Sequence, residues 1–425
     1  MAEQAKVPAI RFAGFTDPWE QRKLGDVASS FDYGLNAAAT EYDGQNKYLR
    51  ITDIDDETHE FSKSDLTTPL ADLAMSADYL LKEGDLLFAR TGASVGKTYL
   101  YRQFDGMVYF AGFLIRARIS EGADPEFAYQ ATLTDAYKKY VAITSQRSGQ
   151  PGVNAQEYAD YQLMLPSKTE QQQIGMTLRS LDDLITLHQR KYDKLVIFKK
   201  SMLEKMFPKD GESVPEIRFA GFTDPWEQRK FGDCFEFLKS NTLSRAGLNG
   251  ENGTARNVHY GDILIKFGDC LDGERSDLPF ITDDTVLPKY AGSILREGDV
   301  IFADTAEDET AGKCVELRKL PKEPTISGLH TIPARPRFPF GTGYLGHYLN
   351  SDAYHRQLLP LMQGIKVISV SKAALQDTQV RFPGLSEQSA IGAALNEIDS
   401  LITLHQRKLE LLQNIKKSLL DKMFV

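Results

Sequence analysis

Two polar loops of the sequence carry side chains suited to binding a polyanion. The first loop supplies Arg90, Thr91, Ser94 and Lys97. It follows residues 85–89, an apolar run that predicts a buried strand, and its charged and hydroxyl groups suit phosphates and base edges. The second loop, residues 145–154, concentrates Arg, Gln and Asn, which make two-pronged hydrogen bonds with guanine or adenine. We expect both loops to contact nucleic acid, and a solvated turn is the alternative for each residue.

Each loop has a counterpart in the second half of the chain. Residues 304–313 follow a similar apolar run but are two residues longer and more acidic than residues 90–97. Residues 363–372 take the place of residues 145–154. A loop that differs in length and charge after the same strand is where differential recognition is expected. The candidate DNA-contacting residues are Arg90, Thr91, Ser94, Lys97, Gln146, Arg147, Gln150, Asn154, Lys313, Gln363, Lys366, Ser369 and Lys372.

Residues 91–98 also resemble the phosphate-binding loop of nucleotide-hydrolysing enzymes. Three residues separate Gly92 from Gly96, whereas that loop needs four. The residues that follow are typical of a strand, whereas phosphate binding uses a helix N-terminus. A nucleotide-hydrolysing enzyme that uses Lys97 is therefore the least favoured alternative.

No other catalytic constellation stands out in the sequence. It lacks the Asn/Asp-Pro-Pro-Tyr/Phe motif of amino-methyltransferases, a His-Glu-x-x-His pair and a Gly-x-Ser-x-Gly elbow. Cys234, Cys270 and Cys314 do not have the short spacings of a zinc site and are expected to be free thiols. We expect no catalytic residue and no metal site in this chain.

An internal repeat determines the layout that must position these loops. Residues 7–27 and 214–234, the two leading segments, are identical at 18 of 21 positions by direct count. Residues 170–207 and 387–424 match at 22 of 38 positions. The stretches between these repeats diverge strongly. Similar ends with dissimilar middles indicate one task performed twice and two different ligands, although duplication followed by drift is the alternative.

The repeated C-terminal segments of the two halves predict long helices. Their apolar positions step by three and four over almost five heptads, which is typical of a coiled-coil seam. The seam residues are Leu178, Leu181, Ile185 and His188 in the first copy and Leu395, Ile398, Ile402 and His405 in the second. At 1.5 Å per residue, each helix would reach about 57 Å. We expect an antiparallel pair whose widened apolar stripe contacts a further partner, with the two histidines fixing register.

The expected fold class is α+β, with two globular domains separated by the two antiparallel helices in a pseudo-twofold, circular arrangement. The predicted boundaries are 1–165 for the first domain, 166–210 for the first helix, 211–385 for the second domain and 386–425 for the second helix. Predicted strands are 46–53, 85–89, 98–101 and 113–119 in the first domain and 262–267, 299–303 and 311–317 in the second. Residues 126–141 and 344–362 are expected to be helical.

Composition limits the classes of function. A chain of 425 residues is too long for one ordinary core. Its net charge of −9 argues against a protein that coats nucleic acid by charge alone. No apolar run approaches the roughly 18 residues of a membrane helix, and no secretory leader is evident, so we expect a cytoplasmic protein without membrane contact.

Three features together resemble the specificity subunits of Type I restriction-modification systems. They are the paired leading segments RFAGFTDPWEQRKLGD and RFAGFTDPWEQRKFGD, the EGDLLFARTG and EGDVIFAD strands, and the helices ending in KKSMLEKMF and KKSLLDKMF. The resemblance covers essentially the whole chain. The leading segments and helices are specific, whereas the strand motifs alone are weak.

The resemblance implies a non-catalytic DNA-reading subunit with two target-recognition domains, each reading half of a split DNA target. It implies double-stranded DNA, two methyltransferase subunits and two restriction subunits as partners. S-adenosylmethionine, ATP and Mg would then belong to those partners, with no cofactor in this chain. A stand-alone bivalent DNA-binding regulator is the main alternative.

Overall fold

The computed structural model describes residues 7–425 except 57, 148 and 275–276. The chain divides into two compact units, unit 1 (Met1–Arg190 with Arg407–Val425) and unit 2 (Lys191–Gln406). Two long helices, α4 (Lys168–Lys205) and α10 (Leu385–Met423), contribute one end to each unit. Among the described residues, no helix is both long and apolar enough to cross a membrane.

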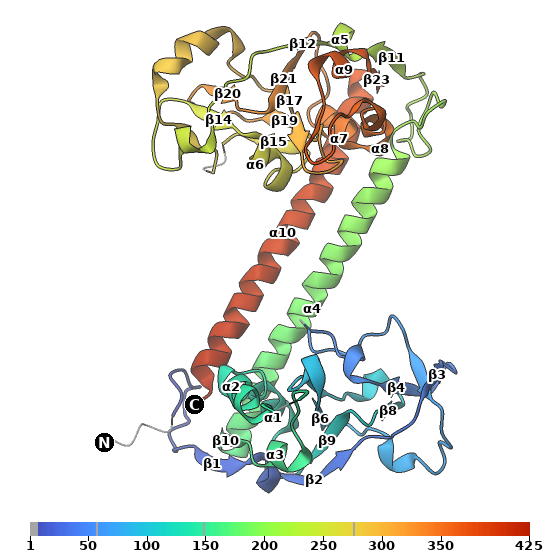
Figure 1. The fold of residues 1–425 in the computed structure, drawn as a ribbon, viewed down its shortest axis with the longest axis vertical. Helices are drawn as coiled ribbons and strands as arrows, with labels where there is room; N and C mark the ends of the chain where they lie inside the picture. Colours follow the sequence, from blue (N-terminus) through green and yellow to red (C-terminus); the bar gives the residue numbers. More distant parts are fainter. Residues whose placement is uncertain (1–6, 57, 148, 275–276) are drawn as a thin grey trace. The chain divides into compact units, whose positions relative to one another are not determined.

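Unit 1 is built on a four-stranded sheet in the order β2-β9-β6-β7 (Figure 1). Its strands are β1 (Glu20–Lys23), β2 (Ala28–Tyr33), β3 (Ala39–Glu41), β4 (Lys47–Leu49), β5 (Thr67–Pro69), β6 (Asp85–Ala89), β7 (Thr98–Leu100), β8 (Val108–Phe110), β9 (Leu114–Ile119) and β10 (Gln162–Leu165). Its shorter helices are α1 (Pro125–Ala131), α2 (Asp135–Thr144) and α3 (Ala155–Ala159).

Unit 2 has the corresponding sheet with one more strand, in the order β12-β21-β17-β19-β15. Its strands are β11 (Glu227–Lys230), β12 (Phe235–Phe237), β13 (Leu248–Asn249), β14 (Arg256–Val258), β15 (Cys270–Asp272), β16 (Phe280–Ile281), β17 (Val300–Ala303), β18 (Thr305–Ala306), β19 (Cys314–Arg318), β20 (Thr325–Ser327), β21 (Thr331–Pro336), β22 (Ile368–Ser369) and β23 (Gln379–Phe382). Its helices are α5 (Phe231–Cys234), α6 (Tyr260–Ile265), α7 (Tyr344–Asn350), α8 (Asp352–His355) and α9 (Lys372–Asp377).

The central strand β6 is apolar at every position after Asp85, and its packing explains why. Leu86 and Phe88 point into the core beneath α1 and α2, whereas Leu87 and Ala89 point into a second core on the other face of the sheet. Because both faces are covered, the strand has no polar side. Every residue of β6 is buried, and the chain leaves the sheet at Arg90.

Most predicted elements are observed, and one prediction is wrong. Residues 262–267 were expected as a strand but lie mostly in α6. The ring of His259 accepts the N–H of Gly261 at the start of α6, and Asp262 pairs with Lys266 one turn later. The apolar alternation of this segment was misleading, because Ile263 in α6 and Phe267 just after it pack into the same core without forming a strand.

Both predicted helical segments are interrupted. Residues 126–141 fall into α1 and α2, because the side chain of Thr134 accepts the N–H of Tyr137 and starts a second helix. Residues 344–362 contain α7, α8 and a 3₁₀ turn, Leu359–Leu361. The 98–101 run forms β7, so the loop before it leads into a strand, unlike a phosphate-binding loop.

The repeated segments make the same contacts in both units. Arg11 donates to both oxygens of Glu170 in unit 1, as Arg218 does to Glu387 in unit 2. The main-chain N–H of Ile10 bonds to the carbonyl of Lys422 at 2.8 Å. Its counterpart in unit 2 is the bond from Ile217 to Lys205 at 2.9 Å. In unit 1 this bond joins the leading segment to the end of α10, which are far apart in the sequence. In unit 2 the equivalent bond joins the second leading segment to the end of α4, which directly precedes it in the chain.

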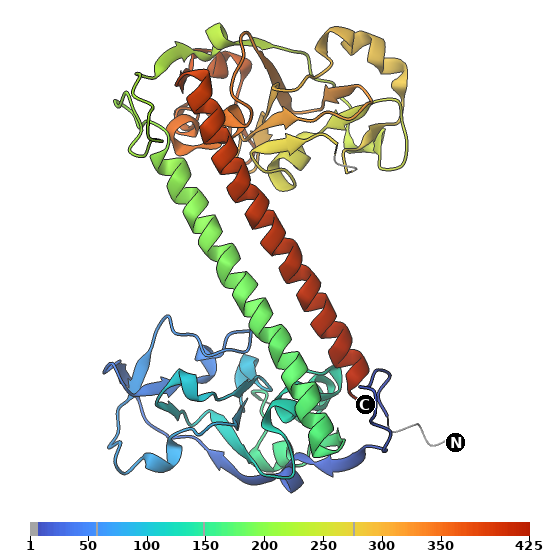
Figure 2. The same ribbon diagram turned by 180° about the vertical axis from the view of Figure 1, so that it is seen from behind.

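The ends of α4 and α10 lie side by side within each unit, as Figure 1 and Figure 2 both show. In unit 1, Asp182 of α4 pairs with Lys416 of α10 at 2.5 Å. In unit 2, Lys199 of α4 pairs with Asp399 of α10 at 2.6 Å. The later residue of α4 pairs with the earlier residue of α10, so the two helices run antiparallel. The predicted seam residues are buried or half-buried, whereas Leu184 and Leu187 of unit 1 are exposed.

Candidate nucleic-acid interface

The two polar loops of unit 1 form one surface. Arg90 directly follows strand β6, and its carbonyl accepts the N–H of Val153 at 2.9 Å. Gly92 donates to the carbonyl of Pro151 at 3.0 Å, and Thr91 forms a β-bridge with Gly152. Segments more than 50 residues apart in sequence are therefore locked together at the end of β6. Ser148, which belongs to the predicted loop, lies outside the described residues.

Two exposed aromatic rings join this surface. The guanidinium of Arg90 lies 5.1 Å from the ring centroid of Tyr33, and its main-chain N–H bonds to the carbonyl of Phe113. Tyr33 is 44% exposed and Phe113 is 57% exposed. An aromatic ring beside an arginine, as Tyr33 is, provides stacking and charge together, as nucleic-acid surfaces do. Neither ring was predicted from the sequence, because nothing local distinguishes an exposed aromatic residue from a core residue.

Several predicted contact residues of unit 1 have structural bonds. Asn154 caps α3 by accepting the N–H of Glu157. Arg147 donates to the carboxylate of Glu157 and to the carbonyl of Thr144. Both side chains are still exposed, as are Gln146 and Gln150, whereas Ser94 is half-buried in the 3₁₀ turn after Arg90. Gln146 and Gln150 are the better placed of these residues for hydrogen bonds with bases.

The predicted lysines after the central strands are held inside their units. In unit 1, Lys97 Nζ bonds to the carbonyl of Ile54 and pairs with Asp56. In unit 2, Lys313 Nζ bonds to the carbonyls of Leu264 and Phe267 at 3.2 and 2.8 Å. Burial lowers the pKa of Lys313. Both ammonium groups therefore tie a neighbouring segment to the sheet instead of facing solvent.

The loops of unit 2 are also joined, by a short antiparallel pairing of β18 with β22. Gln363 and Ser369 exchange main-chain hydrogen bonds at 3.0 and 2.8 Å, which closes a hairpin. At its tip, Gly364 has a φ of 114° and Ile365 is 97% exposed. Lys366, beside Ile365, is exposed as well. The sequence predicted the polar residues here but not the exposed isoleucine.

The charge of the unit 2 surface differs from that of unit 1. Loop 304–313 carries exposed carboxylates at 307–309. Hydrogen bonds from the side chain and main chain of Thr310 lower the pKa of Asp308, so it is charged at neutral pH. Lys372 does not offset them, because its Nζ bonds to the carbonyl of Leu238. Carboxylates accept from the amino group of cytosine but repel phosphates.

One group of side chains has the composition of a metal site. The ligand atoms of Asp269, His347 and Asp399 lie within 4.8 Å of one another. Lys199 Nζ lies between the two carboxylates, 2.6 Å from each, and His347 Nδ1 bonds to Asp269 at 2.9 Å. The ammonium group already supplies the positive charge that these carboxylates require. The cluster is an internal ion-pair network that fixes the sheet of unit 2 to its helix ends.

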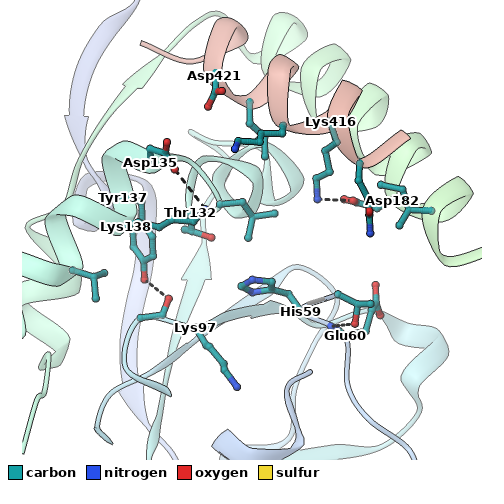
Figure 3. A pocket seen from close by; sticks show the side chains of 18 of the residues that line it. His59, Glu60, Lys97, Thr132, Asp135, Tyr137, Lys138, Asp182, Lys416 and Asp421 are labelled. Carbon is teal, nitrogen blue, oxygen red and sulfur yellow. Dashed lines mark hydrogen bonds and ion pairs between the residues drawn. The ribbon is translucent and has the colours of Figure 1, made fainter. Parts of the chain in front are cut away.

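Unit 1 instead has an open pocket of about 730 Å³ at the same place. Figure 3 shows His59 and Glu60 on one side and the Lys416–Asp182 pair on the other. His59 has a φ of 55°, and its Nδ1 lies 3.1 Å from the carbonyl of Thr98. Burial lowers the pKa of His59 and raises the pKa of Glu60.

Comparisons with known proteins agree with this architecture. The family of Type I restriction modification DNA specificity domains matches residues 16–196. The Type I restriction enzyme MjaVIII specificity subunit of Methanocaldococcus jannaschii is 22% identical over 95% of this chain and 92% of its own length. The putative type I restriction enzyme MjaX specificity subunit of the same organism gives the same identity and coverage. The crystal structure of a Type I restriction-modification S subunit from M. genitalium is 13% identical, covers 99% of both chains and has a TM-score of 0.62.

The two units with their joined loops and the long helices α4 and α10 therefore give the fold of a Type I specificity subunit, and residues 16–196 match a DNA specificity domain. Residues 16–196 match that family, and the chain is similar over nearly its whole length to Type I restriction enzyme specificity subunits.

Proposed function

We propose that this chain reads a split DNA target, with one half-site bound by the joined loops of each unit. The observation that carries the proposal is the joining itself. Two polar segments that are distant in sequence meet at the end of the central strand in unit 1, and their counterparts meet in unit 2. A rigid sheet beneath such loops is the usual way to hold base-reading side chains in register.

The partners we propose are two methyltransferase subunits and, for cleavage, two restriction subunits. Apolar side chains on the long helices support a docking role, since exposed apolar surface on a helix marks a contact face. In unit 1 these include Leu184 at 43% exposure and Leu187 at 45%, and in unit 2 Ile197 at 69%, Phe198 at 51% and Leu404 at 45%. S-adenosylmethionine, ATP and Mg would be bound by the partners, in the cytoplasm.

A stand-alone bivalent DNA-binding regulator is the second candidate. The exposed apolar helix residues disfavour it, because a protein without partners would leave Ile197 and Phe198 in water. The net charge of −9 also disfavours binding to DNA without help from a basic partner.

The test is a genome-wide map of N6-methyladenine in the source strain with and without this gene. We expect one bipartite motif to lose methylation when the gene is deleted. An unchanged map, together with failure of the chain to co-purify a methyltransferase, would contradict the proposal and favour the regulator.

A second test addresses the spacer of the target. Inserting one heptad into α4 and one into α10, in phase with the seam, adds about 10 Å to the helix pair at 1.5 Å per residue. We expect a longer unspecified spacer and unchanged half-sites. A methylation motif with its original spacing would contradict the role of the helices as a ruler.

A further inference from the structure

A second concave surface of unit 2 lies at the end of the sheet opposite the joined loops. It is a pocket of about 540 Å³ formed where β17 begins and where β19 and β21 end. Its charged lining residues with basic side chains are Arg296, Arg318, Lys319, Arg335 and Arg337. Phe338 and Phe340 form an apolar wall beside them. In a chain with a net charge of −9, this is a marked local excess of cations.

Two of the three carboxylates at the pocket are already engaged within the unit. Asp299 accepts two hydrogen bonds from Arg335, at 2.9 and 2.7 Å. Glu316, which is buried, accepts the main-chain N–H groups of Gly343 and Gly346. Glu297, the third carboxylate, is exposed to solvent.

The remaining arginines of the pocket have no carboxylate partner. Within the part of the chain that the structure describes, Arg296, Arg318 and Arg337 form no ion pair within 4 Å, and Arg337 Nε bonds only weakly, at 3.2 Å, to the carbonyl of Phe235. Lys319 lies 3.5 Å from Asp272, and both side chains are about half-exposed. Guanidinium groups that are not paired with the carboxylates of their pocket are suited to phosphate oxygens.

Unit 1 shows an ion pair at the position of Arg318. By strand register, Leu86 faces Leu100 as Val300 faces Glu316, so Arg102 is the counterpart of Arg318. Arg102 is buried and forms an ion pair with Glu126 at 2.7 Å.

The counterpart of Glu126 in unit 2 is Gly343. The two helices are aligned by equivalent hydrogen bonds, from the N–H of Asp124 to Gln171 at 2.8 Å and from the N–H of Gly341 to Gln388 at 2.9 Å. Replacing the carboxylate by glycine frees the guanidinium at this position in unit 2.

We propose that this basic pocket binds phosphate groups of the DNA backbone, outside the loops that read bases. The inference rests on the proposed DNA-binding function. Loop 304–313 is acidic and would repel the backbone, so unit 2 needs backbone affinity from another surface. The four residues of β17 separate pocket from loop by roughly 13 Å, close to the ~12 Å width of a major groove. A duplex read by the loops thus has phosphates within reach of the pocket.

The experiment measures duplex binding by the chain in its complex with the methyltransferase as a function of salt concentration. The variant Arg296→Gln/Arg318→Gln removes two cations of the pocket. Each lost phosphate contact lowers the slope of log K against log salt by about 0.9, so we expect a loss of about one to two. The effect should be equal for target and non-target duplexes, because backbone contacts carry no sequence information.

Two further variants separate binding from folding. Lys230→Gln/Lys289→Gln removes two exposed cations of the same unit outside the pocket and should leave the slope unchanged. Arg318→Lys keeps the charge and should retain most of the slope. A pocket variant that melts as the wild type does but keeps the full slope overturns the proposal.

The remaining outcomes also decide. Loss of methyltransferase binding with an unchanged slope would overturn the proposal in favour of an acidic protein surface. Thermal stabilisation of wild type, but not of the pocket variant, by inorganic phosphate, together with an unchanged slope for the pocket variant, would overturn it in favour of a free phosphate compound. A wild-type complex that binds no duplex would overturn the proposed function itself.

Discussion

In unit 1 the segment that carries His59 and Glu60 stands across an open pocket from α10, whereas in unit 2 the segment before β15 reaches the helices. Among the described residues, Lys416 of unit 1 pairs with one carboxylate, Asp182. Its counterpart in unit 2, Lys199, has two, Asp399 and Asp269. The lysine and the helix aspartate are repeated, and the second carboxylate comes from the divergent middle of the chain.

This difference teaches where a duplicated scaffold can vary. The contacts between the leading segments and the long helices are nearly identical in the two units, down to the Trp–Phe ring distance of 6.4 Å in each. The contacts between the recognition sheet and the helices are not. The repeated frame holds the position of each sheet, so the surface above it can change charge and shape independently.

The largest expected effect concerns the aromatic residue at the end of each helix. Phe207 is 1% exposed and packs against Trp226, Tyr344 and Tyr348. Phe207→Ala should lower the free energy of unfolding of unit 2 by about 3–5 kcal/mol, because it leaves a buried cavity. Phe424, next to the C-terminus, is half-buried, and Phe424→Ala should cost about 2 kcal/mol in unit 1.

Denaturant unfolding with a probe in each unit measures both losses. Phe104→Ala, at a ring that is 66% exposed, is the control and should change stability by less than about 0.5 kcal/mol. Equal losses at Phe207 and Phe424 would contradict the difference in burial between the two rings.

The second prediction uses the ion-pair network of unit 2. Burial alone would raise the pKa of Asp269, but the hydrogen bond from His347 and the charge of Lys199 lower it to about 2. A lowered carboxyl pKa contributes stability that is present above the unfolded pKa, near 4, and is lost as the pH falls through about 2. The contribution is about 2 kcal/mol.

Asp269→Asn should remove this contribution at neutral pH and flatten the acid unfolding profile of unit 2 between pH 4 and 2. Unfolding scans across that range measure the change. Asp377→Asn, which breaks an exposed pair with Lys230, should shift stability by well under 1 kcal/mol. An acid profile of Asp269→Asn that matches the wild type would show that the network does not stabilise the packing of the unit 2 sheet against its helix ends.

The smallest expected effect belongs to the open pocket of unit 1. Because burial raises the pKa of Glu60, its charged form is disfavoured in the folded unit. Stability from this group is present at low pH and is lost as the pH rises through the folded pKa. Glu60→Gln should therefore stabilise unit 1 at neutral pH by up to about 1 kcal/mol, as measured by thermal unfolding.

Glu121→Gln, at an exposed glutamate of the same unit, is the matched control and should have no measurable effect. If Glu60→Gln destabilised unit 1 instead, the carboxylate would have a favourable partner across the pocket, as Asp269 has in unit 2. The contrast between the open pocket of unit 1 and the ion-pair network of unit 2 would then be wrong.

Local and periodic information was enough for much of the fold. The heptad pattern predicted α4 and α10, and the apolar runs predicted β6, β17 and β19. Such patterns are sufficient because the spacing of apolar residues indicates which side of an element is buried. The prediction for segment 262–267 was wrong, because apolar residues four positions apart fit a helix as well as an alternating strand.

The candidate site was predicted in part. Both loops were identified from their polar composition and their position after a strand. Their joining, the exposed rings of Tyr33 and Phe113, and the exposed Ile365 could not be identified, because exposure depends on neighbours supplied by distant segments. The same dependence buried Lys97 and Lys313, which by residue type alone are the most obvious phosphate ligands.

By itself, the sequence determined that this protein has two similar units, two long helices and two different polar loop sets, because repeats and periodicity are properties of residue order. Tertiary structure alone decided which cations are free. Arg102 and Arg318 occupy equivalent positions, yet Arg102 pairs with Glu126, whereas Gly343 stands at the position of that glutamate in unit 2. Whether a charged side chain is available to a ligand depends on the residue that folding places beside it. Glu126 lies 24 residues after Arg102, and Gly343 lies 25 residues after Arg318, so sequence order alone does not show these relations.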